Sequence, residues 1–364
     1  MRIVAEPIAV EDVWSAGPAS PELSVFSSPE WLRFLQRSQG ATPVALRLLL
    51  DGTEVGWFTG AVVRRGGLRL LGSPLPGWTT SYMGVALSQA VTDASSLDPS
   101  AVRRAALSAV RRVALRNLRC AHLEVLDRAL DPDDPLPRGL VASPFHSFEL
   151  DLAGDEQLLR GMSTNARRNL ARAERKGVQV DVVDRADAPD FASVYYRHAL
   201  ETFAKRSVVP PYPRERVEQL IETVHPSGRL LLLRARTSGG EVAATGIFAG
   251  VPGGTATFLM GASRQEHLVV RPNEALMWRA LTWWRDQGAV RFDFGGGGDY
   301  KLKFGPRPIR SAWVRTSLPG SEAARAFLRR QVRRRQRRTF AAGVGVRQAD
   351  PYTESSTPQG ENTW

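Results

Sequence analysis

The order of apolar patterns along the chain constrains its fold more than any other feature. A helical pattern, alternating strand-like runs, a second helical pattern and a closing strand occur in residues 1–150 and again in residues 151–318. Apolar residues at three- and four-residue spacing predict helices, whereas alternating runs between glycine-containing turns predict antiparallel strands. The sequence therefore predicts an α/β fold of mixed sheets with flanking helices. Two units of roughly 150 residues fit the pattern better than one sheet does.

The first unit begins with a helix capped by Ser28, and Pro29 stands at its first position. Strands are predicted at Val44–Leu50, Val55–Val63, Leu68–Leu71 and His122–Leu126, with a helix over Pro99–Leu118 before the last of them. The first three strands are separated by Asp51-Gly52 and Gly66-Gly67, which predicts an antiparallel meander. Phe145–Leu152 begins the crossing into the second unit.

The second unit begins with a helix over Asp155–Lys176, which Gly177 ends. Further helices are predicted at Ala188–Arg206, after Pro213 and at Pro272–Gln287, and strands at Arg229–Arg236, Val242–Val251, Thr255–Ala262, Val290–Phe294 and Ile309–Ser317. Beyond this unit we expect a basic helix over 319–340 and a disordered tail over 341–364, where Ser, Thr, Gln, Pro and Gly are frequent.

Composition excludes several classes of protein. The 364 residues contain one cysteine, Cys120, so neither an internal disulfide nor a thiolate-rich metal site is expected. It opens an apolar stretch, which favours a buried cysteine in a strand over a catalytic one. No uncharged apolar run approaches the ~18 residues that a membrane helix needs, and Met1–Val13 lacks the apolar core of a signal peptide. We therefore expect a cytoplasmic protein. The five histidines show no metal-ligand spacing, and no metal is predicted.

Positive charge is concentrated near the C-terminus. The chain carries a net charge of +12, and residues 306–364 hold 12 arginines against four acidic residues. Much of this excess lies in Arg329–Arg338. Such a segment can bind phosphate-rich partners such as tRNA, or hold the protein at the periphery of an anionic membrane. A solubilising tail is the equally weighted alternative.

The most informative block of sequence lies between Met260 and Gly305. It contains a small-residue strand end at Gly261-Ala262-Ser263, the helix start Arg271-Pro272-Asn273, the strand end Phe292-Asp293-Phe294-Gly295, and Tyr300-Lys301-Leu302-Lys303-Phe304-Gly305. A helix N-terminus presents free backbone N–H groups and the positive end of a dipole, which together favour an anion. Pro272 costs nothing at the first helical position, because the N–H that it lacks would have no partner there.

This block resembles the tandem-domain Fem/CelD-like branch of the GNAT superfamily, which comprises nonribosomal aminoacyl transferases and acetyltransferases. Tyr300-Lys301 with Phe304-Gly305 matches that family's aromatic-Lys-x-x-aromatic-Gly motif at the same spacing. Asn165–Gly177 is similar to the basic helix that opens the family's second half, and Phe26–Trp31 resembles its first helix. The resemblance implies two tandem GNAT-like domains, an acceptor-side domain over 1–150 and a donor-side domain over 151–318.

The resemblance also implies roles for individual residues. It ties Lys301 to catalysis, by stabilising negative charge on the acyl carbonyl or on an acceptor phosphate. Asp293, at a strand end, is the second catalytic candidate: it could accept a proton from the attacking amine or simply cap the turn. The predicted donor-binding residues are Arg271, Asn273, Gly295, Gly296, Tyr300 and Phe304. The predicted acceptor-binding residues are Trp78 and Tyr82, in an irregular aromatic loop, and Arg168 and Arg172, on one helical face. Packing of the two aromatic rings and a solvated basic helix are the alternatives.

The resemblance predicts an N-acyltransferase in which an amine attacks the donor carbonyl directly, in cell-envelope or polysaccharide biosynthesis. No bound cofactor is expected, and the co-substrate is acyl-CoA or aminoacyl-tRNA. Coenzyme A-dependent GNAT enzymes usually carry a glycine-containing phosphate loop where this chain has Val269–Glu274, and the helical-hairpin insertion of some Fem enzymes is missing too. These two departures leave the donor open. The alternative function is a non-catalytic GNAT scaffold that binds nucleic acid or an anionic membrane through its arginine-rich segment.

Overall fold

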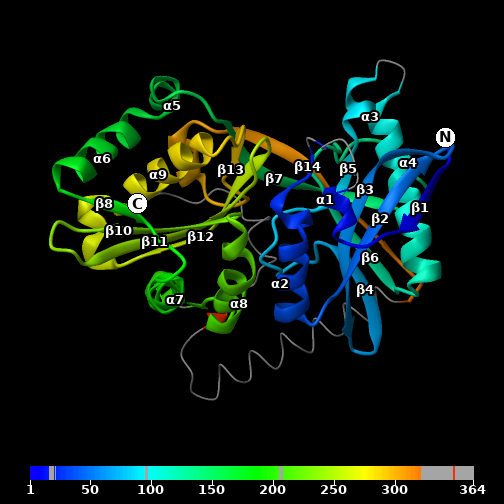
Figure 1. The fold of residues 1–364 in the computed structure, drawn as a ribbon, viewed down its shortest axis with the longest axis horizontal. Coiled ribbons are helices and arrows are strands. Elements are labelled where there is room, and N and C mark those ends of the chain that lie inside the picture. Colours follow the sequence, from blue (N-terminus) through cyan, green and yellow to red (C-terminus); the bar gives the residue numbers. More distant parts are fainter. Residues whose placement is uncertain (16–19, 21, 95–96, 205–207, 321–346, 349–364) are drawn as a thin grey trace.

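A computed structural model describes residues 1–15, 20, 22–94, 97–204, 208–320 and 347–348 (Figure 1). The predicted basic helix over 319–340 and tail over 341–364, including Arg329–Arg338, lie almost entirely outside the described residues. No helix in the described part of the chain is both long and apolar enough to cross a membrane.

The first half follows the predicted order of elements closely. Its helices are α1 (Asp12–Ser15), α2 (Pro29–Gln39), α3 (Gln89–Asp93) and α4 (Pro99–Arg112), with a 3₁₀ turn η1 (Val25–Ser27) and a π-helical turn η2 (Val113–Asn117). Its strands are β1 (Ile3–Pro7), β2 (Thr42–Leu50), β3 (Thr53–Arg65), β4 (Leu68–Ser73), β5 (Gly84–Leu87) and β6 (His122–Asp127). The Ser28 hydroxyl accepts a bond of 3.2 Å from the Trp31 N–H, which confirms the predicted cap of α2.

The second half contains most of the predicted elements, with one helix divided. Its helices are α5 (Asp155–Gly161), α6 (Thr164–Arg175), α7 (Ala188–Ala204), α8 (Arg214–Val224) and α9 (Pro272–Asp286), with 3₁₀ turns η3 (His225–Ser227), η4 (Gln265–Val270) and η5 (Asp299–Phe304). Its strands are β7 (Val141–Asp151), β8 (Gln179–Val182), β9 (Val208–Val209), β10 (Leu230–Arg236), β11 (Val242–Ala249), β12 (Thr255–Ser263), β13 (Arg291–Asp293), β14 (Arg307–Ser317) and β15 (Arg347–Gln348).

The predicted single helix over Asp155–Lys176 is wrong in its middle. Met162 is extended, with ψ 147°, and the Ser163 hydroxyl accepts a bond from the Ala166 N–H at 3.1 Å. Ser163 therefore caps a new helix rather than continuing the first one, because serine oxygens compete well for free N–H groups at helix starts.

Strands of both halves join in one sheet, which differs from the separate sheets that the sequence pattern favours. Among the described residues, 13 strands form this sheet, in the order β1-β2-β3-β4-β6-β14-β7-β13-β12-β11-β10-β8, with β5 added on β3. The last long strand, β14, lies between β6 of the first half and β7, and is antiparallel to both. The sequence could not predict this pairing, because β14 follows β6 by about half the chain.

Helices cover both faces of the sheet. In the second half α9 packs against β10 and β11 on one face, whereas α7 packs on β11 and β12 from the other (Figure 1). Consequently Leu230–Leu233 are all buried, without the alternation of a half-exposed strand. The helices α2 and α8 pack together across the junction of the halves. One apolar cluster therefore includes Trp31 and Phe34 from the first half and Phe191 and Leu220 from the second.

Candidate active site

The parallel strands β12 and β13 of the second half pair only over three residues, and we call the region between β12 and the chain beyond this pairing the wedge. β12 pairs with β13 only from Thr255↔Arg291 to Thr257↔Asp293. Beyond this point β13 ends, whereas β12 continues to Ser263. Backbone groups on the free side of β12 then lack a strand partner, so a ligand can use them. Phe294 continues the pairing of β13 with β7, since its N–H donates to Phe148 O at 2.8 Å.

Asp293 lies at the closed end of this wedge and is 2% exposed. Its Oδ1 accepts the Gly295 N–H at 2.7 Å, which is the turn-capping bond weighed from the sequence. Burial raises the pKa of the Asp293 carboxyl, while the Arg128 charge and the Gly295 N–H act in the opposite direction. The aspartate is thus held in a fixed place in a dry site.

Lys301 comes back to the same place from η5. Its side chain is buried, and its Nζ donates to Gly296 O at 2.7 Å. The intervening chain needs glycine: Gly295, Gly297 and Gly298 all have φ near +72°, in the left-handed region. A Cβ on Gly296 would lie 3.0 Å from His146 O. The glycine run is therefore a tightly packed turn that allows the lysine to fold back over it.

Arg128 completes the cluster, although it was not among the predicted site residues. Its Nη2 lies 2.5 Å from Glu149 Oε2, and its Nη1 lies 3.6 Å from Asp293 Oδ2. Glu149 is shared with Arg307, at 2.8 Å. Burial opposes the charge of Arg128, but its contacts with Tyr82 and the two carboxylates raise its pKa above the ordinary value. One signal was available: Arg128 directly follows the buried strand β6, at a strand end like that of Asp293.

The aromatic loop of the first half reaches this cluster through Tyr82. The Arg128 guanidinium lies over the Tyr82 ring, 4.4 Å from its centre, close enough for a cation–π contact. Phe26 approaches the same ring edge-on at 5.0 Å. Burial raises the pKa of Tyr82, and the Arg128 charge opposes this. Trp78 is also buried, in the same apolar cluster at the junction of the halves as Tyr82.

The start of α9 lies at the open end of the wedge. Arg271 precedes it with φ 60°, a left-handed conformation that favours glycine, and no side chain caps this helix. The Arg271 Nε is buried and has no hydrogen-bond partner in the described part of the chain. Asn273 Nδ2 donates to Ser263 Oγ at 3.3 Å, which ties the helix start to the end of β12. A helix N-terminus without a cap and an unpaired guanidinium nitrogen both suit an anion.

Comparison with known proteins identifies the family of the second half of the chain. Residues 161–303 match the model of the acetyltransferase (GNAT) domain. The second half is a GNAT domain. The sequence has no significant match among curated proteins.

Solved structures extend the likeness to the whole chain at the level of the fold. The crystal structure titled FemX superposes with a TM-score of 0.61 at 12% identity, covering 85% of this chain and 96% of that one. A conserved protein of unknown function from Bacteroides thetaiotaomicron VPI-5482 gives a TM-score of 0.53 at 10% identity, covering 87% and 100%. The predicted membership of the GNAT superfamily, with the fold of its Fem-like branch, is confirmed, and the family match supports an acyltransferase in general.

Two predicted donor residues differ in their surroundings within the GNAT domain. Phe304 is 3% exposed and stacks on Phe294 at 5.8 Å, so its ring belongs to the core and is not available to a donor. The motif packs in this way because Gly305, with φ 83°, approaches the Gly161 backbone closely. Tyr300, in contrast, is half exposed, and its ring lies 5.8 Å from Lys301 Nζ.

Arg168 and Arg172 are not brought together with Trp78 and Tyr82. They lie on α6, which packs on α9 and η5, far from α2 in Figure 1. Asn169 of the same helix donates to Glu274 of α9 at 3.0 Å, and Lys303 of η5 pairs with that carboxylate at 2.9 Å. Because α6 packs beside the start of α9, Arg168 and Arg172 lie nearer to the predicted donor-binding residues than to the acceptor loop.

Cys120 is fully buried, as predicted, but it lies two positions before the start of β6 rather than in a strand. Within the described ranges, no group of three or more His, Cys, Asp or Glu side chains could hold a metal ion.

Proposed function

We propose that the protein is an N-acyltransferase that transfers an acyl or aminoacyl group from an activated donor to an amine. The observation that carries the proposal is the convergence of Asp293, Lys301 and Tyr82. Each of these residues was singled out by sequence. Asp293 and Tyr82 both contact Arg128 at the closed end of the β12–β13 wedge, and the Lys301 ammonium lies near enough to Asp293 to lower the pKa of its carboxyl.

The proposed reaction uses no covalent intermediate. The amine nitrogen attacks the donor carbonyl carbon, an amide bond forms, and the bond from that carbon to the thiol sulfur or ribose oxygen breaks. The amine loses a proton and the leaving group gains one. Lys301 is the proposed stabiliser of negative charge on the carbonyl oxygen, because a buried ammonium acts strongly in a site of low dielectric constant.

Asp293 is assigned to proton transfer with the amine or to positioning, and its contacts support positioning. One carboxylate oxygen caps the glycine turn and the other faces Arg128. The cluster would then hold Lys301 and the glycine run in the geometry that the reaction needs.

Coenzyme A suits the start of α9. The N–H groups of its first turn and the Arg271 guanidinium would hold the donor's diphosphate. Arg271 provides the left-handed residue that a glycine provides in other phosphate loops, so the loop keeps this conformation without glycine. Aminoacyl-tRNA remains the second candidate donor, and its phosphates would extend to Arg168 and Arg172 on α6.

Calorimetric titration of the protein with acetyl-CoA tests the donor. We expect saturable binding that Arg271→Ala weakens, since the substitution removes the guanidinium whose Nε has no hydrogen-bond partner in the described part of the chain. Absence of binding by the unaltered protein would remove coenzyme A from the proposal and leave aminoacyl-tRNA to be titrated in the same way.

The role of Lys301 is tested by release of coenzyme A thiol from acetyl-CoA in the presence of primary amines. Lys301→Ala is expected to lower turnover on the order of 10²- to 10³-fold, as for loss of one charge-stabilising donor. Lys303→Ala removes a lysine from the same turn and is the matched control. Equal turnover in the two variants would exclude a catalytic Lys301, and binding without any turnover would favour the non-catalytic scaffold.

A further inference from the structure

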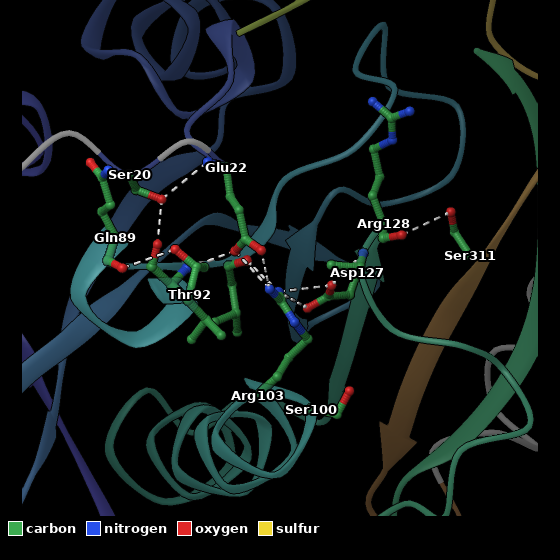
Figure 2. A network of polar contacts seen from close by, with 12 residues as sticks. Ser20, Glu22, Gln89, Thr92, Ser100, Arg103, Asp127, Arg128 and Ser311 are labelled. Carbon is green, nitrogen blue, oxygen red and sulfur yellow. Dashed lines mark hydrogen bonds and ion pairs between the residues drawn. The ribbon is translucent and has the colours of Figure 1, made fainter. Parts of the chain in front are cut away.

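Arg103 is the centre of a buried ion-pair network beside the site (Figure 2). It belongs to α4, and its side chain is 3% exposed. Its Nη1 donates to Val85 O at 2.7 Å and lies 3.0 and 3.1 Å from the two oxygens of Asp127. Its Nη2 lies 2.6 Å from both oxygens of Glu22. One guanidinium thus binds two carboxylates that are far apart in the sequence.

The Asp127 arm of the network leads to Arg128. The Asp127 carboxylate also accepts the Ala129 N–H at 3.1 Å, and the Ser311 hydroxyl donates to Arg128 O at 3.5 Å. The backbone on both sides of Arg128 is therefore held. In Figure 2 the Arg128 side chain extends away from Arg103, which leaves its guanidinium free to reach Asp293 and the Tyr82 ring.

The ion pair of Arg103 with Glu22 leads to Phe26, a second residue that contacts Tyr82. Glu22 Oε2 accepts the Leu87 N–H at 2.7 Å, which fixes the segment that enters η1. Phe26, in η1, meets the Tyr82 ring edge-on at 5.0 Å with an interplanar angle of 75°. Arg103 therefore fixes the chain near two residues that contact this ring, Arg128 over its face and Phe26 at its edge.

Stability alone is a weak explanation for this network. The cost of taking charges out of water offsets much of the attraction within a buried ion pair, so well-packed apolar residues often serve stability equally well. Only a planar fork of N–H donors can bind two carboxylates in fixed directions, and lysine, a point charge, cannot.

We propose that Arg103 is a positioning residue, which holds Arg128 over Tyr82 through Asp127 and Phe26 against Tyr82 through Glu22. This inference rests on the proposed function only in so far as Arg128 belongs to the transfer site. Arg103 touches no substrate in this arrangement and acts through its neighbours.

The test compares Arg103→Lys with Arg104→Lys. Arg104 is the next residue on α4, and its guanidinium lies 3.6 Å from Asp98 and 4.0 Å from Asp134. Arg104→Lys therefore makes the same replacement of arginine by lysine at a residue outside the Arg103 network. Asp127→Asn is the second network variant, in case Arg103→Lys does not fold. Cooperative thermal unfolding establishes that each variant is folded.

The first readout is the Arg128 Nε–Hε signal in ¹H–¹⁵N spectra, assigned by its disappearance in Arg128→Lys. An N–H over the face of a ring is shifted upfield by the ring current. We expect the network variants to move this signal toward that of solvent-exposed arginine, and Arg104→Lys to leave it in place. An unmoved Arg128 signal in a folded network variant would overturn the proposal.

The second readout is a double-variant cycle on turnover of acetyl-CoA. If Arg103 acts through Arg128, Arg103→Lys lowers turnover on the order of 10- to 100-fold alone and has little further effect when Arg128 is already lysine. If the fold-reductions in turnover caused by Arg103→Lys and Arg128→Lys multiply in the double variant, the proposal is contradicted. If the unaltered protein turns over no acetyl-CoA, the proposed function fails for this donor, while the NMR shift still decides the role of Arg103.

Discussion

Replacing Arg128 by methionine should destabilise the protein in a way that depends on pH. The substitution keeps the length of the apolar stem but leaves Asp293 and Glu149, which are 2% and 4% exposed, without their shared cation. Removing one partner of a buried ion pair costs about 3–5 kcal/mol. Glu149 keeps Arg307 at 2.8 Å, so we expect the lower end of this range, about 3 kcal/mol.

The pH dependence follows from Asp293. Its pKa is already raised by burial, and Arg128 is the largest influence in the opposite direction. Without Arg128 the pKa of Asp293 rises further, so the folded state binds its proton more tightly than the unfolded state does. The stabilisation that this proton gives is lost as pH rises through the folded-state pKa, and the deficit of the variant should therefore be larger at pH 7.5 than at pH 5.

Urea unfolding followed by tryptophan fluorescence at both pH values measures these free energies. The double variant Arg128→Met/Asp293→Asn should recover part of the loss at pH 7.5, because an amide can be buried without an unpaired charge. Arg310→Met removes an exposed arginine that pairs with Asp133 and is the control, for which no change is expected. A loss at pH 7.5 below about 1 kcal/mol, the scale of a surface ion pair, would refute this account of the cluster.

Three further predictions follow from single groups. Burial and nearby arginines lower the pKa of His198 to about 4. Between pH 6.5 and pH 4 the unfolded chain therefore binds a proton at this histidine that the folded chain does not, and the free energy of unfolding should fall by about 2–3 kcal/mol over this range. Urea unfolding at both pH values should show a much smaller fall in His198→Gln. The raised pKa of Asp293 means that ionising this carboxyl costs stability, so Asp293→Asn should become more stable relative to the unaltered protein as pH rises above about 4. Release of coenzyme A thiol should fall in the same variant. A difference in unfolding free energy between variant and unaltered protein that does not change with pH would contradict this. Arg271→Gly should raise the melting temperature, since glycine accepts φ 60° without strain. The same variant should bind acetyl-CoA more weakly, because it lacks the guanidinium. Unchanged binding would exclude the guanidinium from the donor site.

Local patterns predicted much of the fold and part of the site. The helices that begin at Pro29 and Pro272 form where their capping and proline signals placed them, and the strand end at Asp293 does carry a buried carboxylate. These features depend on a few neighbouring residues. The break at Met162 was missed because the apolar spacing continues across it while the Ser163 hydroxyl starts a second helix.

What the sequence could not indicate depends on distant contacts. Arg128 acquires its role only from carboxylates at positions 149 and 293, which strand pairing brings to it. Phe304 belongs to a family motif, yet its ring is committed to Phe294 in the core, so a matched motif position did not mean contact with a ligand.

The place of β14 between β6 and β7 has a consequence for synthesis of the chain. All six residues of β6 are buried, yet its partner strand is made only after residues 128–306 have followed. At ~5–20 residues per second, the nascent first half waits about 10 to 40 seconds with one edge of β6 unpaired. Such an edge can capture a strand from another nascent chain, so we expect slowed translation or early termination before Arg307 to yield aggregates rather than a working half-protein.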